Sequence, residues 1–60
     1  MRLFSIGELS RYSCATLREL AARMASAIAV LPQGSVERRI AFDNLRLIRF
    51  VLAQRLLSPH

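Results

Sequence analysis

The sequence predicts one domain over residues 1–60, mainly α-helical, with three helices and one small β-hairpin. Three features support this fold class: two helix-start signatures in tandem near the N-terminus, a proline and glycine turn between short apolar segments, and a long apolar stretch near the C-terminus. A domain of this size buries only about 60% of the surface of its unfolded chain. We therefore expect low stability without a partner.

The first helix-start signature is Ser5 followed by Glu8. In such a capping box the serine hydroxyl accepts a hydrogen bond from the N–H of the glutamate, and the carboxylate accepts one from the N–H of the serine. This pattern predicts a short helix from about Ile6 to Tyr12, and Phe4 is expected to anchor the lead-in to the core.

The second signature is Thr16 followed by Glu19, which predicts a helix that begins at Leu17 after a break near Ser13. Two short helices joined by a three-residue turn are typical of a helix-turn-helix. The second helix of such a pair can enter the major groove of DNA, with its first-turn residues near base edges. An alternative is an ordinary small bundle, in which Glu19 and Arg23 form a surface pair.

A turn follows at residues 32–35, which read PQGS, with glycine in the third position that a type II turn favours. Residues 28–31 precede it, and residues 36–40 follow it with alternating apolar and charged side chains. Helical spacing competes with this interpretation as far as Ile28, but the turn favours a β-hairpin. Such a hairpin would be a wing bearing Arg38 and Arg39 beside the helix-turn-helix.

The third helix is predicted from about residue 43 to residue 57, with Leu45, Ile48 and Leu52 toward the core. This helix has more apolar side chains than one small core can cover, and a surplus of that kind usually marks an interface. The predicted oligomer or partner interface consists of Leu47, Phe50, Val51 and Leu57.

The charge indicates a polyanionic partner. The chain has nine arginines, no lysine and four acidic residues, for a formal net charge of +5. Arginine binds phosphate and guanine edges bidentately, whereas lysine offers a point charge. A GC-rich genome would produce the same arginine and alanine content, so composition alone leaves both causes open.

Other functional classes lack the residues that they need. Cys14 is the single cysteine, which excludes an intramolecular disulfide and fits a reducing cytoplasm. Neither a metal-ligand set nor a nucleophile with an adjacent base is present in the sequence, so we expect no enzyme, no cofactor and no metal site. The apolar run at residues 25–31 is too short to span a bilayer. We expect a cytoplasmic, nucleoid-associated protein with no membrane partner.

Three stretches carry a family resemblance. Residues 4–10 read FSIGELS, residues 13–23 read SCATLRELAAR, and RRI at residues 38–40 precedes NLRLIRFV at residues 44–51. They resemble the MerR-type winged helix-turn-helix DNA-binding domain, whose members open with [YF]-[ST]-I-G-E-[LV]-A and continue T-G-V-S-x-R-T-L-R-Y-Y. Family members later have R-R-Y followed by D-L-x-x-L-x-F-I.

The resemblance implies contacts to double-stranded DNA from the recognition helix and from the wing. The resemblance assigns Thr16, Leu17 and Arg18 to the major groove, and Arg38 and Arg39 to the minor-groove edge or phosphate. Arg23, on the outward basic face of the second helix, completes the predicted DNA-binding set. The departures imply weaker affinity per domain: Cys14 replaces a turn glycine, Ala22 and Arg23 replace a phosphate-gripping tyrosine pair, and Ile40 replaces the wing tyrosine. The sequence has no long dimerisation helix and no effector domain, so we expect no small-molecule effector.

Three functions fit these features. The first is a small sequence-specific transcriptional regulator that binds DNA cooperatively. The second is an excisionase-like recombination directionality factor, or a phage or mobile-element accessory protein, because such proteins are similar small basic winged helices. The third is a protein-interaction module without DNA contact, in which the third helix docks to a larger protein.

Overall fold

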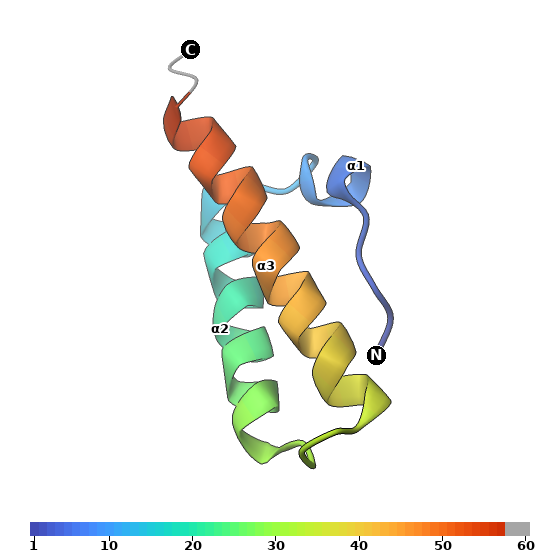
Figure 1. Cartoon of the computed structure of the whole chain (residues 1–60). Helices are drawn as coiled ribbons and strands as arrows, with labels where there is room; N and C mark the ends of the chain where they lie inside the picture. Colours follow the sequence, from blue (N-terminus) through green and yellow to red (C-terminus); the bar gives the residue numbers. More distant parts are fainter. Residues whose placement is uncertain (58–60) are drawn as a thin grey trace.

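The computed structural model describes residues 1–57. It contains three helices, α1 (Ile6–Leu9), α2 (Cys14–Val30) and α3 (Val36–Leu57). Helices α2 and α3 form an antiparallel hairpin, and α1 packs against α3 (Figure 1). None of the helices in this described part has an apolar stretch of the length that crossing a lipid bilayer requires.

The predicted wing is wrong, although the mainly α-helical prediction is confirmed. Residues 1–57 contain no β-strand: residues 28–30 complete α2, and residues 36–40 begin α3. Alternation over five residues is weak support for a strand when a helical pattern continues beyond it. Ala41, Leu45 and Ile48 continue that pattern and are buried, whereas Val36 is 74% exposed. Packing of the helices therefore overrides the local alternation.

The turn that joins α2 and α3 was predicted correctly, but it reverses two helices instead of two strands. The N–H of Ser35 donates to the carbonyl of Pro32 at 3.2 Å, and Gly34 has a φ of +82°, as the third position of a type II turn requires. The Ser35 hydroxyl then accepts from the N–H of Arg38 at 3.1 Å and so caps α3. This cap explains why the third helix begins before Asp43, the predicted start.

The capping box of α1 is confirmed. The Ser5 Oγ accepts from the N–H of Glu8 at 3.1 Å, and the Glu8 carboxylate accepts from the N–H of Ser5 at 3.5 Å. The helix ends at Leu9 and not at Tyr12, because Ser10 already forms its C-cap. Phe4 packs against the core cluster that contains Leu9.

The predicted start of the second helix is wrong. Ser13 is the N-cap of α2, and its Oγ accepts from the N–H of Thr16 at 3.1 Å, which places Thr16 inside the helix. With this cap the N–H of Leu17 also bonds to the carbonyl of Ser13 at 2.9 Å. A start at Ser13 therefore satisfies more backbone groups than a start at Thr16.

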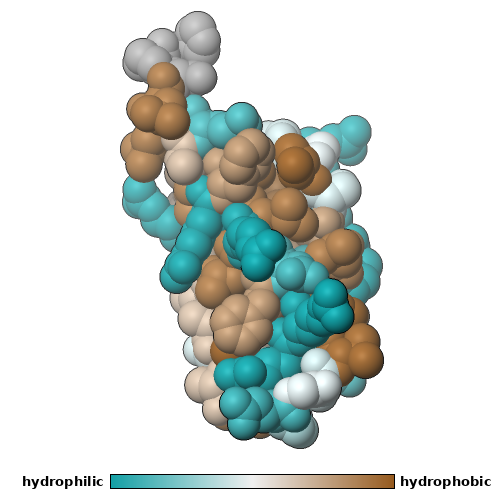
Figure 2. Space-filling model, viewed as in Figure 1, coloured by the Kyte–Doolittle hydropathy of each residue, from teal (hydrophilic) through white to brown (hydrophobic). Residues whose placement is uncertain are grey.

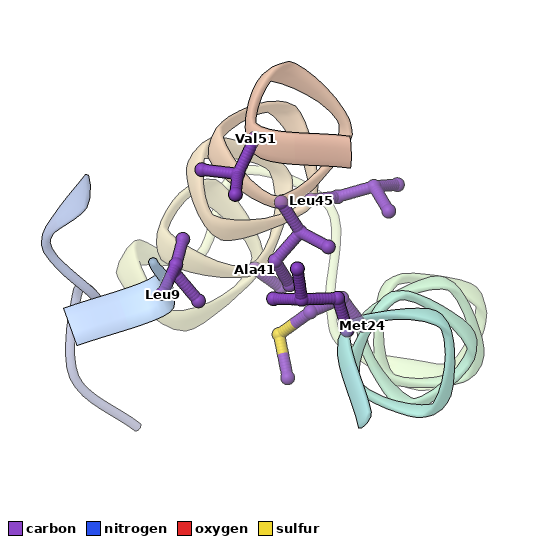
Figure 3. Packing of buried hydrophobic residues seen from close by; sticks show 7 residues of the cluster. Leu9, Met24, Ala41, Leu45 and Val51 are labelled. Atoms are coloured by element: carbon purple, nitrogen blue, oxygen red, sulfur yellow. The ribbon is translucent and has the colours of Figure 1, made fainter. Parts of the chain in front are cut away.

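The hydrophobic core lies where the three helices meet. Its buried apolar residues are Leu9, Leu17, Met24, Ala41, Leu45, Ile48 and Val51. Leu9 of α1 and Met24 of α2 approach α3 from two sides (Figure 3). Val51, predicted at an interface, is only 4% exposed because α3 must cover α1 as well as α2. Ile6, in the first turn of α1, is 46% exposed.

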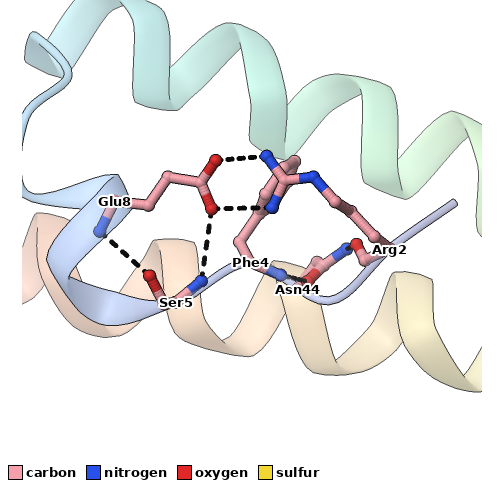
Figure 4. Close-up of polar contacts among 5 residues, drawn as sticks. All are labelled: Arg2, Phe4, Ser5, Glu8 and Asn44. Carbon is pink, nitrogen blue, oxygen red and sulfur yellow. Dashed lines mark hydrogen bonds and ion pairs between the residues drawn. The ribbon is translucent and has the colours of Figure 1, made fainter.

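One polar residue, Asn44, is buried with this core and attaches the N-terminal segment to α3. Its Oδ1 accepts from the N–H of Phe4 at 2.8 Å, and its Nδ2 donates to the carbonyl of Arg2 at 2.9 Å (Figure 4). The Arg2 guanidinium in turn binds both carboxylate oxygens of Glu8. The lead-in, α1 and α3 therefore form one connected unit.

Candidate nucleic-acid interface

The nine arginines divide into two groups. Arg2, Arg38 and Arg55 bind other parts of the chain; Arg55, for example, donates to the carbonyl of Ser10 at 2.9 Å and holds the α1–α2 connection against α3. The other arginines are exposed, and their side chains have no hydrogen-bond or ion-pair partner within residues 1–57. This second group consists of Arg11, Arg18, Arg23, Arg39, Arg46 and Arg49.

Three of these free arginines lie on one face of α3. Arg39, Arg46 and Arg49 surround Phe42 at spacings of three, four and three residues, which places all four side chains on one side of a helix. We call these four residues the basic face. It lies opposite the side of α3 that carries buried Asn44. On the exposed surface of α3, hydrophilic and hydrophobic patches adjoin each other (Figure 2).

Phe42 is held by an arginine that is itself anchored. The guanidinium carbon of Arg38 lies over the Phe42 ring, 5.0 Å from its centroid. The Arg38 Nε donates to the carbonyl of Ile28 in α2 at 3.2 Å. Because Arg38 is half-buried and bonded to another helix, it covers one side of the ring as a fixed support.

Two shallow hollows open on the basic face, and Phe42 and Arg46 line both of them. The larger hollow has a volume of about 600 Å³ and the smaller one about 230 Å³. The larger is also lined by Gly34, Ser35, Val36, Arg38, Arg39 and Asp43. The smaller is also lined by Leu45 and Arg49. Each hollow therefore combines an aromatic ring with at least two arginines.

Little negative charge opposes these arginines. Among the residues that line the hollows, Asp43 is the only carboxylate, and it forms no ion pair within residues 1–57. Glu8 is engaged elsewhere: the Arg2 guanidinium bonded to it holds the pKa of its carboxyl below the usual value. The basic face therefore remains positively charged and favours an anionic ligand.

The structure does not bring the predicted recognition-helix residues together at one surface. Leu17 is fully buried in the core and has no exposed surface with which to contact DNA, because it faces α3. Thr16 is half-buried, and its hydroxyl lies 3.0 Å from the Ser13 Oγ. Arg18 and Arg23 are exposed, but five residues separate them by about 140° around α2.

The two predicted wing arginines lie on α3 and have different surroundings. Arg38 is half-buried and bonded to Ile28, whereas Arg39 is exposed and belongs to the basic face. Of the predicted interface residues, Phe50 is 47% exposed and Leu57 is 82% exposed. Leu47 packs partly against the core.

Phe42, Arg46 and Arg49 were not among the site residues predicted from the sequence. Their spacing from Arg39 is visible in the sequence, but residues 36–40 were assigned to a strand. That assignment separated Arg39 from the arginines about two and three helical turns later. A search for helical spacing from Ser35 onward would have found the basic face.

Comparison of the chain with known protein families, with curated proteins and with solved structures found no match. The resemblance to the MerR-type domain therefore rests on sequence motifs, and the wing that it implies is not found in residues 1–57.

Proposed function

We propose that this chain binds DNA through the basic face of α3. The observation that supports this most is the set of three exposed arginines, Arg39, Arg46 and Arg49, with no ion pair within residues 1–57. From Arg39 to Arg49 the helix rises about 15 Å. Over that length duplex DNA carries about nine phosphate charges, so three guanidinium groups can each meet a phosphate.

The physical basis is the release of counterions. Each phosphate that an arginine neutralises releases a condensed cation, so affinity falls with salt at a log–log slope of about −0.9 per contact for duplex and about −0.7 for single strands. Three contacts predict a slope of about −2 to −3. The net charge of +5 adds long-range attraction at low salt.

Two charge-matched variants test the location of the site. One replaces Arg39, Arg46 and Arg49 with glutamine, and the other replaces Arg11, Arg18 and Arg23 with glutamine. Each lowers the formal charge by three, from +5 to +2, at exposed positions without an ion pair within residues 1–57. Affinity for labelled DNA is measured by fluorescence anisotropy over a range of salt concentrations.

We expect the α3 variant to lose most of the affinity and to flatten the salt slope, while the control variant loses less. Equal losses in the two variants would show that only net charge matters and would exclude the basic face as a site. If the unmodified chain has no salt-dependent affinity for DNA, the proposal is wrong. That result would favour a protein-interaction module without DNA contact.

A second candidate is sequence reading by α2, as a transcriptional regulator or a recombination accessory protein would require. Arg18 and Arg23 are exposed on the two flanks of α2. The exposed residues between them include the small Ala22 and Ser26 and the acidic Glu19. Small side chains between two arginines suit a helix in a major groove. A larger loss in the control variant, confined to a preferred sequence, would support this candidate.

A further inference from the structure

The Phe42 side chain does not belong to the hydrophobic core. Its side chain is 45% exposed in the middle of an arginine-rich face, and it is not among the apolar residues that pack against the core. Aromatic side chains that stay in water beside cations are typical of surfaces that bind unpaired bases. The ring is therefore a candidate for ligand contact.

The orientation of the ring is set before any ligand arrives. Arg38 covers one side of the ring, and its bond to the Ile28 carbonyl keeps the guanidinium in place. A ring supported in this way loses little conformational freedom when a second planar group stacks on it. The two hollows that Phe42 lines provide room for such a group.

The arginines beside the ring provide positive charge for the anionic part of such a ligand. Arg39 and Arg46 line one hollow, and Arg46 and Arg49 line the other. A group stacked on Phe42 therefore has cationic side chains close to it along the helix. A nucleotide within a single strand has this chemistry: a planar base with a phosphate on each side.

We infer that the basic face takes unpaired nucleotides of DNA, with one base stacked on Phe42 and the flanking phosphates bound by Arg39, Arg46 and Arg49. This inference rests on the proposed function. In an intact duplex both faces of a base are covered by its neighbours. A phenylalanine can reach such a face only as a wedge, and unstacking a base step costs a few kcal/mol. The geometry therefore favours single-stranded DNA over the same sequence as a duplex.

The test compares the full chain on a labelled oligodeoxynucleotide of about 15 nucleotides, single-stranded or annealed to its complement. Phe42→Leu removes the aromatic ring but keeps an apolar side chain and the charge. We expect it to weaken single-strand binding roughly 5- to 150-fold, the range that loss of one stacked base produces. Duplex affinity and the salt slope should not change, because no phosphate contact is lost.

Phe50→Leu is the matched control. It is the same substitution on the same helix at a similar exposure, 47%, and the arginine–aromatic stacks within residues 1–57 involve Phe4 and Phe42 only. We expect this variant to bind single strands as tightly as the unmodified chain. Far-UV circular dichroism of both leucine variants tests whether they retain their helices.

Phe42→Trp provides an independent readout, because the sequence has no other tryptophan. A stacked base quenches tryptophan fluorescence, so we expect quenching with single strands and little with duplex. Equal quenching by both DNA forms would overturn the inference, as would unchanged single-strand affinity in Phe42→Leu. Both results would leave the proposed function intact if binding stayed salt-dependent, whereas loss of all salt-dependent binding would remove both proposals.

Discussion

The Arg38 side chain donates to the carbonyl of Ile28 the hydrogen bond that no backbone N–H can provide at this position. The carbonyl of Ile28 lies in the last turn of α2, where carbonyls have no partner within the helix. The residue four positions later is Pro32, which has no N–H to donate. The Arg38 Nε donates at 3.2 Å instead. It also brings a positive charge to a helix end whose own last turn has no basic residue.

Replacement of Arg38 by alanine should lower the free energy of unfolding by about 1 to 2 kcal/mol, because a charged hydrogen bond is lost and a carbonyl is left without a partner. Urea denaturation followed by circular dichroism measures this change. Arg39→Ala is the matched control, since Arg39 is exposed and has no partner within residues 1–57. Its effect should stay within about 0.5 kcal/mol. Equal effects would contradict a structural role for Arg38.

Asn44→Leu should destabilise the chain by about 2 kcal/mol or more, because the N–H of Phe4 and the carbonyl of Arg2 both lose their partner. Asn44→Asp keeps the acceptor for Phe4 but places a second oxygen against the Arg2 carbonyl, so it should also destabilise. Amide hydrogen exchange at Phe4 reports the attachment directly. Retained protection of that amide in Asn44→Leu would show that the segment is held by other contacts.

Stability should depend on Glu8 in a pH-dependent way. The hydrogen-bonded Arg2 guanidinium, and to a lesser degree the N–H of Ser5, lower the pKa of Glu8 in the folded chain, and partial desolvation opposes them. A lowered folded-state pKa means that the stabilisation is complete above the unfolded value of about 4.3 and is lost as pH falls through the folded value.

Glu8→Gln should therefore lower Tm near neutral pH, and the difference from the unmodified chain should shrink in acid. Thermal melts at a series of pH values measure it. Glu19→Gln, at an exposed carboxylate without an ion pair within residues 1–57, is the control and should show no such trend. A Tm difference that is the same at all pH values would mean that Glu8 acts only as an uncharged cap.

Assembly on DNA should depend on the apolar residues near the C-terminal end of α3. Phe50 and Leu57 are exposed, lie seven residues apart and therefore share a helix face. We expect the double variant Phe50→Ser, Leu57→Ser to lose cooperative binding to DNA that is long enough for several copies of the protein. Its affinity for DNA that accommodates only one copy should not change.

Analytical ultracentrifugation and titration on short and long DNA measure this difference. Copies with a charge of +5 repel each other in solution, so association should appear when DNA neutralises them. Non-cooperative binding of the unmodified chain to long DNA would contradict the prediction.

The sequence by itself determined the cap at Ser5 and the turn at residues 32–35, whereas the helix start at Thr16, predicted from the same kind of local pattern, was wrong. The reciprocal hydrogen bonds of Ser5 and Glu8 were predicted correctly, and so was the turn at residues 32–35, which the bond from the N–H of Ser35 to the carbonyl of Pro32 closes. Backbone geometry and side-chain chemistry at these positions allow few alternatives. The excess of arginine is likewise a property of composition.

Only the tertiary structure decided whether residues 36–40 form a strand or a helix. Their short alternation fits both, and the choice follows from burial of Ala41, Leu45 and Ile48 against the other helices. The role of Asn44 was also hidden, because its partners lie 40 and 42 residues away. Arg38 and Arg39 show the same limit: adjacent in sequence, they point about 100° apart on α3. Arg38 bonds to α2, whereas Arg39 is exposed to solvent. This difference arises only when the helices pack.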